Sequence, residues 1–257
     1  MTFWQHLIPQ HFLSKLMFKF TRLKTRWIYK AFTNWIIKTY SVNLSEAKTQ
    51  NIDDYECFND FFTRELKDGV RPIGDGFVSP VDGTLSQCGV IENGKLIQAK
   101  GKKYTLSALL GSGVNYQNFA TIYLAPGDYH RIHAPLDGKL LKMEYIGGDL
   151  FSVNNQTANS VDNLFARNER VVCHFDTYTI VLVGAIFVGS MEVVWHGMIT
   201  PPYGKRFVID YTDKGISLKK GAELGRFNMG STVVLLSNNH EFDLQIGQKV
   251  KMGETIN

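Results

Sequence analysis

The chain has 257 residues, of which 44% are hydrophobic and 20% are charged. That composition can fill one large core or two modest ones, and it excludes an intrinsically disordered protein. The three cysteines, Cys57, Cys88 and Cys173, form no CxxC pair and are odd in number. They argue against a disulfide framework or a thiolate metal site, and they favour a reducing, cytoplasm-facing compartment.

The net charge of +4 comes from the N-terminal segment. Every base of that segment precedes the first acidic residue, Glu46, and the rest of the chain carries more acids than bases. The bases are Lys15, Lys19, Arg22, Lys24, Arg26, Lys30 and Lys38. A short basic segment suits an anionic lipid surface, and we expect no nucleic-acid partner.

Apolar residues recur at helical spacing from Phe12 to Ile37, with the bases between them. This pattern predicts amphipathic helix. Trp4, Trp27 and Trp35 fall in or near it, as in helices that lie in the headgroup layer of a membrane. A helix packed against its own domain fits the same pattern, and a mitochondrial transit peptide is a weaker alternative because serine is scarce. No apolar run reaches the length of about 20 residues that a helix needs to span a bilayer.

Beyond about Ile52 the chain is rich in short β-like runs bounded by glycine. They are GFVSP, GTLSQCGVI, GKLIQA, FATIYL, RVVCHF, YTIVLVGAIFVGSMEVV and TVVLL. Helical pattern is limited there to parts of Cys57–Leu66 and Leu106–Leu110. We therefore expect an α+β protein, with a helical membrane-association segment at residues 1–48 that caps a mostly β domain at residues 49–257.

A weak internal repeat predicts a duplicated β-unit within this core. The segment SPVDGTL at Ser79–Leu85 is echoed by APLDGKL at Ala134–Leu140, and KKGAELGRF at Lys219–Phe227 is echoed in part by VKMGETI near the end. Paired Pro-x-Asp-Gly turns between strands are expected where one β-unit occurs twice.

Two of the seven histidines, His130 and His133, lie close together in PGDYHRIHAPLDG. In a strand, residues three apart point to opposite faces, whereas a turn or bulge can aim both into one cleft. The spacing alone leaves both arrangements open. The other histidines lack the spacings that mark zinc sites, and we expect no metal.

The chain contains three Gly-Ser pairs, at Gly111, Gly189 and Gly230. Most such pairs are turns. A serine hydroxyl can also attack the carbonyl carbon of the residue before it, and the resulting ester can eliminate to leave a pyruvoyl group on the new N-terminus. Backbone strain of about 1–3 kcal/mol is too small to drive this reaction alone, so a base is required. Chemistry alone does not choose among the three pairs.

Several motifs in order resemble those of the phosphatidylserine decarboxylases, which are pyruvoyl-dependent lyases. They are FNDFFTRELKDGVRPI at Phe58–Ile73, SPVDG at Ser79–Gly83, APGDYHRIHAP at Ala125–Pro135, GDLFSVN at Gly148–Asn154 and KGAELGRFNMGSTVVLL ending at Leu236. The resemblance covers most of the chain, with Met229 where the family usually has leucine.

The resemblance implies self-cleavage between Gly230 and Ser231, which gives a β chain to Gly230 and an α chain from Ser231 that together form a heterodimer. It implies a triad of Asp82, His133 and Ser231, with His130 linked to decarboxylation. Ser231 would become a covalent pyruvoyl cofactor that forms a Schiff base with phosphatidylserine and releases CO2 to give phosphatidylethanolamine. Which histidine donates the proton in decarboxylation stays open.

The same resemblance implies a peripheral protein on the cytoplasmic face of the bacterial inner membrane. Its partners would be phosphatidylserine and the anionic membrane surface, with a higher homo-oligomer also possible. Two other readings compete with it: a zinc endopeptidase built on His130 and His133, and a membrane adaptor with a lipoyl-like unit that carries Lys251.

Overall fold

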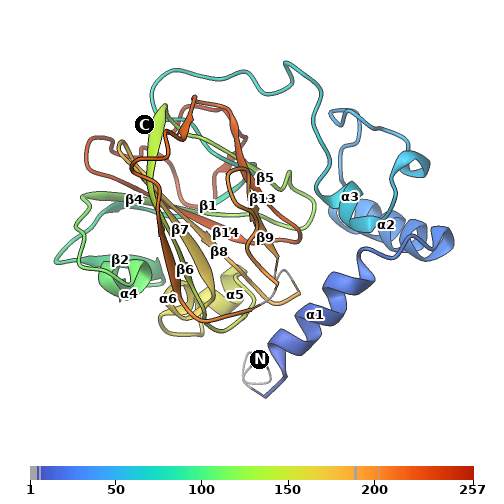
Figure 1. Ribbon diagram of the computed structural model, residues 1–257, viewed down its shortest axis with the longest axis horizontal. Helices are drawn as coiled ribbons and strands as arrows, with labels where there is room; N and C mark the ends of the chain where they lie inside the picture. The colour runs from blue at the N-terminus through green and yellow to red at the C-terminus, as the bar shows by residue number, and fades with distance from the viewer. Residues whose placement is uncertain (1–4, 6, 188–189, 202) are drawn as a thin grey trace.

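The computed structural model describes residue 5 and residues 7–187, 190–201 and 203–257. A β core occupies most of the molecule, and the first three α-helices lie beside it on the right of Figure 1. The helices of the described chain are α1 Gln10–Phe20, α2 Arg26–Tyr40, the 3-10 helix η2 Ile52–Asp54, α3 Phe58–Phe62, α4 Leu106–Leu110, α5 Asn155–Ala158 and α6 Leu164–Arg167. This is the α+β class with mostly β content that the sequence predicts.

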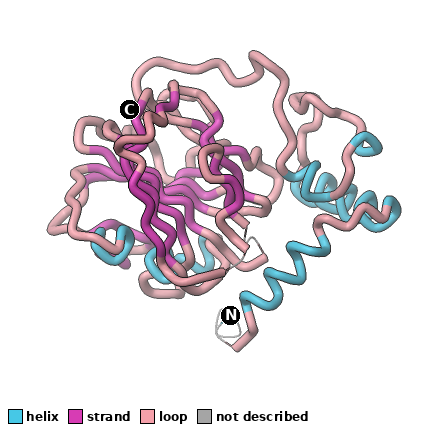
Figure 2. The backbone as a smooth tube through the Cα atoms, in the orientation of Figure 1, coloured by secondary structure: helices cyan, strands magenta, loops and turns pink. Residues whose placement is uncertain are grey.

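One large antiparallel sheet forms the centre of the core (Figure 2). Its strand order is β11-β6-β7-β8-β14-β4-β1-β15, and β12 also pairs with β6. The bounds are β1 Gly83–Val90, β4 Asn118–Tyr123, β6 Gly138–Ile146, β7 Arg170–Phe175, β8 Thr179–Val183, β11 Phe207–Asp210, β12 Ser217–Leu218, β14 Thr232–Ser237 and β15 Lys249–Val250.

A smaller antiparallel sheet and a hairpin complete the core. The smaller sheet has the order β10-β9-β13-β5, with β5 Arg131–His133, β9 Met191–Val193, β10 Gly197–Met198 and β13 Glu223–Phe227. The hairpin joins β2 Lys95–Ala99 to β3 Lys102–Thr105. β13 and β14 follow each other in sequence but belong to different sheets, so the chain passes between the sheets at residues 228–231.

Strand β14 is central because its sequence has no polar face to present to water. All six of its residues are buried, and it pairs with β8 on one side and β4 on the other. A continuous apolar run of this kind is typical of a strand that is covered on both faces. Its first residue follows Ser231 directly, so the Gly-Ser pair stands where the chain enters the middle of the sheet.

The two Pro-x-Asp-Gly turns confirm the duplicated β-unit. Ser79 exchanges backbone hydrogen bonds of 2.8 and 2.9 Å with Gly253–Glu254, and Ala134 exchanges two of 2.8 Å with Gly221–Ala222. Gly253 and Gly221 have positive φ angles of 88° and 82°, which only glycine adopts readily. β1 begins after the first turn and β6 after the second, so the sequence repeat corresponds to a repeated structure.

The amphipathic stretch of Phe12–Ile37 folds as two helices, separated at residues 21–25. α2 packs against α3 in a cluster of their buried side chains, which are Tyr29, Ile36, Phe58, Phe61 and Phe62. Because this cluster joins residues on both sides of position 48, the division at that position stays a prediction. None of the described helices combines the length and the apolar character that crossing a membrane requires. Trp4 lies outside the described residues.

Two expected strands differ from the structure. GFVSP contributes only the isolated bridge between Val78 and Thr255. Its backbone makes the hydrogen bonds of the first repeated turn instead. YTIVLVGAIFVGSMEVV does not continue as one strand: β8 ends at Val183, and the chain leaves the large sheet at Gly184 before β9 begins. A Cβ atom at Gly184 would lie 3.0 Å from the Glu169 side chain, a tight contact that a glycine at this bend avoids.

Candidate active site at Gly230 and Ser231

Ser231 is fully buried at the entrance to β14. Its carbonyl oxygen accepts a hydrogen bond of 2.9 Å from the backbone N–H of Leu124, which extends the pairing of β14 with β4. Its Oγ has no hydrogen-bond partner among the described residues. Buried hydroxyl groups are usually paired, so this one is available to a reacting or bound group.

The backbone just upstream of Gly230 is held by contacts from distant parts of the chain. The Phe227 N–H donates to the His130 carbonyl at 3.0 Å, and Asn59 Nδ2 donates to the Asn228 carbonyl at 3.2 Å. α3, which carries Asn59, and the histidine segment therefore both position the peptide that precedes the Gly-Ser pair.

His130 is the histidine nearest to Gly230. A Cβ atom built on Gly230 would lie 3.7 Å from His130 Nε2. The ring is fully buried against Phe62, with 4.1 Å between ring centroids, and its Nδ1 lies 2.8 Å from the Asp128 carbonyl. Because a carbonyl only accepts, Nδ1 carries the proton and Nε2 keeps a free lone pair. Nε2 has no partner within the described residues.

The charge state of His130 follows from its burial. Desolvation lowers the pKa of His130 to about 3, and the nearby Arg64 guanidinium contributes in the same direction. The imidazole is therefore neutral at physiological pH. A neutral ring with its free nitrogen toward Gly230 is a proton acceptor placed beside the peptide that joins Gly230 to Ser231.

His133 and Asp82 have other partners. His133 Nδ1 donates to the Gly221 carbonyl at 2.8 Å, and its Nε2 accepts from the Tyr129 hydroxyl at 3.1 Å. Burial lowers the pKa of His133 as well. Asp82 is bound by the Arg71 guanidinium, with contacts of 2.6 and 3.1 Å. Across the described chain, no hydrogen bond joins Asp82, His133 and Ser231.

Asp82 has a counterpart in the second copy of the β-unit. Asp82 Oδ1 accepts a hydrogen bond of 2.8 Å from the Met252 N–H, and Asp137 Oδ1 accepts one of 2.8 Å from the Lys220 N–H. One oxygen of each aspartate thus closes the repeated turn. The difference lies in burial: Asp137 is on the surface, whereas the side chain of Asp82 is 13% exposed.

Arg64 belongs to the site although we assigned it no role from the sequence. It is 5% exposed, and its Nη2 lies 3.2 Å from the Gly127 carbonyl and 3.5 Å from the Asp128 carbonyl. The Asp128 carbonyl is also the partner of His130. Nε and Nη1 of Arg64 have no hydrogen-bond partner in the described part of the chain. The only sequence signal was its place in the FFTREL motif.

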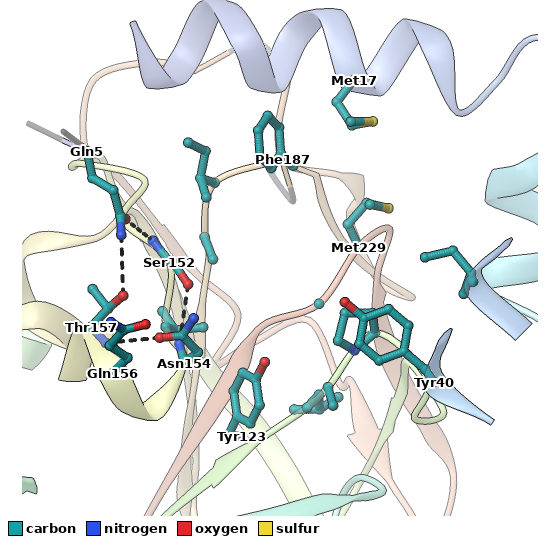
Figure 3. A pocket seen from close by; sticks show the side chains of 18 of the residues that line it. Gln5, Met17, Tyr40, Tyr123, Ser152, Asn154, Gln156, Thr157, Phe187 and Met229 are labelled. Atoms are coloured by element: carbon teal, nitrogen blue, oxygen red, sulfur yellow. Dashed lines mark hydrogen bonds between the residues drawn. The ribbon is translucent and has the colours of Figure 1, made fainter. Parts of the chain in front are cut away.

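A cavity of about 600 Å³ opens beside Gly230. Figure 3 shows its walls, with Tyr40 and Met17 contributed by the N-terminal helices and Met229 by the segment upstream of Gly230. Most of the lining is apolar, and Ser152, Asn154 and Gln156 add polar groups on one side. The cavity can hold a molecule that has both an apolar part and a polar part.

The other Gly-Ser pairs lie in different settings. Gly111 has a φ of +66° and ends α4, so the first pair is a helix-terminating turn. Gly189, in the second pair, lies outside the described residues. Among the described residues, no three His, Cys, Asp or Glu side chains come together to hold a metal ion.

Comparison with known proteins decides between the readings of this site. The family model described as phosphatidylserine decarboxylase matches residues 58–257, and a second model, described as PSD, matches residues 2–41. The chain belongs to the phosphatidylserine decarboxylase family. That is a family of carboxy-lyases, and neither the zinc endopeptidase nor the lipoyl-like adaptor fits this membership.

Curated relatives support the same family over nearly the whole chain. A phosphatidylserine decarboxylase proenzyme of Shewanella amazonensis is 51% identical, over 90% of this chain and 87% of its own length. Proenzymes of the same name from Pseudoalteromonas translucida and Pseudomonas fluorescens are 51% and 46% identical, over 93% and 98% of this chain and 89% and 94% of their own lengths.

Proposed function

We propose that this chain is a phosphatidylserine decarboxylase proenzyme that cleaves itself between Gly230 and Ser231. The observation that carries the proposal is the neutral His130, whose free Nε2 faces Gly230 beside the buried hydroxyl of Ser231. The cavity next to Gly230 supports a lipid substrate, because its walls are mostly apolar and Ser152, Asn154 and Gln156 lie together on one side (Figure 3).

Self-cleavage would begin when Ser231 Oγ loses its proton to a base and attacks the Gly230 carbonyl carbon. The C–N bond breaks as the C–O bond forms, so the peptide becomes an ester. Removal of the Ser231 α-proton then expels the Gly230 carboxylate, and hydrolysis of the dehydroalanine releases ammonia and leaves a pyruvoyl group. A positioned base contributes about 10²–10⁴-fold to steps of this kind.

The site fits a pyruvoyl group derived from Ser231, because Ser231 is fully buried and the residue before it, Gly230, both lines the cavity and lies beside His130 Nε2. Such a carbonyl binds the amine of a serine head group and takes up the electrons that CO2 leaves behind. His130 would hold the proton that returns to the α-carbon of the head group. The apolar walls would exclude water from that position.

Asp82 and His133 enter the proposal as the other triad members that the family resemblance implies. To act on Ser231, His133 would have to exchange the Gly221 carbonyl or the Tyr129 hydroxyl for a new partner, and Asp82 would have to share its contact with Arg71. In the arrangement described here, His130 is the histidine beside the peptide bond that would be cleaved.

The two products would stay together as a heterodimer. The α chain from Ser231 would contain β14, which pairs along its length with β4 and β8 of the β chain. Breaking one peptide bond removes none of these contacts. A higher homo-oligomer stays a prediction.

We also propose that the protein lies on an anionic membrane surface, at the cytoplasmic face of the bacterial inner membrane. Several large apolar side chains of the N-terminal helices are exposed, among them Phe12 at 64% and Trp27 at 75%, next to the lysines and arginines of the same segment. Aromatic side chains next to basic side chains are typical of protein segments that lie in the headgroup layer of an anionic membrane.

The test is an intact mass spectrum of the denatured protein beside the Ser231→Ala variant. We expect two fragments for the wild type, divided at Gly230/Ser231, with the smaller one blocked at its N-terminus, and one full-length species for the variant. The wild type should also convert phosphatidylserine to phosphatidylethanolamine. A single full-length wild-type species would overturn the proposal.

A further inference from the structure

Helix α1 has two uncharged polar side chains buried and two large apolar side chains exposed. Gln10 and Ser14 are 7% and 1% exposed, whereas Phe12 and Leu16 are 64% and 57% exposed. Water-soluble helices normally show the reverse arrangement. A lipid surface accounts for the exposed apolar face, but it does not account for buried polar residues on the face toward the protein.

The buried face of α1 accepts hydrogen bonds from the main chain of two loops. The Leu150 N–H donates to Gln10 Oε1 at 2.6 Å, and the Phe187 N–H donates to Ser14 Oγ at 3.1 Å. Just before the helix, Gln5 Oε1 accepts from the Ser152 N–H at 2.9 Å (Figure 3). These contacts join the N-terminal segment to residues 147–154 and 184–187.

The same two loops contribute part of the lining of the cavity beside Gly230. Ser152, Val153 and Asn154 line it from one loop, and Ala185, Ile186 and Phe187 line it from the other. On the core side both loops are held by the buried Asn168, whose amide bonds Phe151 and the Gly184 carbonyl at 2.8 to 3.1 Å. Each loop is therefore fixed between Asn168 and the N-terminal segment.

We infer that α1 is part of the substrate site, and that Gln10 and Ser14 are positioning residues that set the two cavity loops for a lipid beside Gly230. The inference rests on the function proposed above. Removing Gln10 Oε1 leaves the buried Leu150 N–H unpaired, and removing Ser14 Oγ leaves the part-buried Phe187 N–H unpaired, so each loop must shift to find another partner. Substrate binding should then weaken even where no membrane is present.

The test uses dihexanoyl phosphatidylserine below its critical micelle concentration, so that the membrane surface plays no part. Ser14→Ala and Gln10→Met should each raise KM for this lipid by about tenfold, with kcat changed less, because one unpaired buried N–H weakens binding by roughly that factor. Ser107→Ala is the matched control, an exposed serine in α4 given the same substitution, and it should keep the wild-type KM.

A vesicle-sedimentation assay distinguishes the role of the exposed face of α1 from that of its buried face. Leu16→Gln should reduce sedimentation with vesicles that contain phosphatidylserine, whereas Ser14→Ala should sediment as the wild type does. Hydrogen exchange needs no substrate: amides at 184–187 should exchange faster in Ser14→Ala, and amides at 147–154 faster in Gln10→Met.

If Ser14→Ala and Gln10→Met both keep the wild-type KM and the amide hydrogen exchange of both loops is unchanged, the inference is wrong. A lower melting temperature without a change in KM would also overturn it, because it would reduce both residues to a structural role. A wild-type protein that releases no CO2 would instead contradict the proposed function, and the exchange of the two loops would still test whether α1 holds them.

Discussion

The free Nε2 of His130 lies 3.7 Å from the point where a side chain on Gly230 would begin. Two features fix this relationship: the Asp128 carbonyl holds Nδ1, and Phe62 packs on the ring. A larger residue at position 230 would also meet the Leu124 carbonyl, 3.3 Å from the same point. The tight contact is therefore the one with the Leu124 carbonyl, whereas His130 Nε2 lies at ordinary van der Waals distance from that point.

Replacing His130 with glutamine should cost decarboxylation far more than stability. The amide keeps a donor for the Asp128 carbonyl but cannot exchange a proton, so we expect kcat to fall by about 10²-fold or more. Because the same histidine is proposed to assist self-cleavage, CO2 release is measured per mole of cleaved chain, which a denaturing gel quantifies. His196→Gln, at an exposed histidine in the turn between β9 and β10, is the control and should retain full activity. Equal activity in both variants would remove His130 from the mechanism.

The directions of the His130 and His133 side chains could not be predicted from the sequence. The spacing of His130 and His133 allowed one shared cleft or two separate directions, and the choice depends on residues far away in the chain. Phe62 packs on the first ring, whereas the Gly221 carbonyl bonds the second. Neither partner could be assigned from local pattern, because both contacts require the fold to be complete.

Strands and repeats were predictable where the pattern is local. The run RVVCHF is β7 from end to end, and LSALL is α4, because a threonine cap and a following glycine bound that helix. The partners of Asp82 were not predictable. Arg71 is eleven residues before it, and only the packing of the long connection after α3 brings the two together.

Arg71 should be essential for the stability of the first repeated turn. Its side chain is 6% exposed, and it bonds both Asp82 and Glu46. The hydrogen bond from Arg71 lowers the pKa of Glu46. Arg71→Leu leaves two partly buried carboxylates without their cation, and we expect the free energy of unfolding to fall by about 3 kcal/mol. Urea denaturation measures this change.

The charge and the geometry of Arg71 can be separated. Arg71→Lys keeps the cation but cannot present two parallel N–H groups to Asp82, so its stability should fall between those of the wild type and Arg71→Leu. Lys219→Leu, the corresponding change at the exposed second turn, should have little effect. A large loss in Lys219→Leu with none in Arg71→Leu would contradict the importance of the buried pair.

Glu169 predicts an unusual pH dependence of stability. Burial raises the pKa of Glu169 to about 8, while its Oε2 accepts a hydrogen bond from Tyr145. Between pH 4.5 and 8 the folded protein therefore keeps a proton that the unfolded chain releases, and this group lowers stability as pH rises through that window. Glutamine cannot ionise and should remove the effect.

Glu169→Gln should accordingly be more stable than the wild type at pH 7, by on the order of 2 kcal/mol. The difference should shrink toward pH 4.5, and denaturation curves at several pH values measure it. The surface variant Glu241→Gln is the control and should follow the wild type at each pH. A pH-independent difference would mean that Glu169 is already ionised in the folded protein.

The exposed rings of the N-terminal helices should control membrane binding without affecting the fold. Trp27 is 75% exposed and Phe12 is 64% exposed, so Trp27→Gln and Phe12→Gln remove little buried area and should leave the melting temperature within a degree or two. Each ring that enters the headgroup layer is worth about 1.5–3 kcal/mol, so sedimentation with anionic vesicles should weaken by about tenfold or more. Val208→Gln is the matched control, an apolar residue that is 51% exposed on β11, and its binding should be unchanged. If Val208→Gln weakens binding as much as the helix variants do, the loss is not specific to the helices, and the proposed membrane-binding face is wrong.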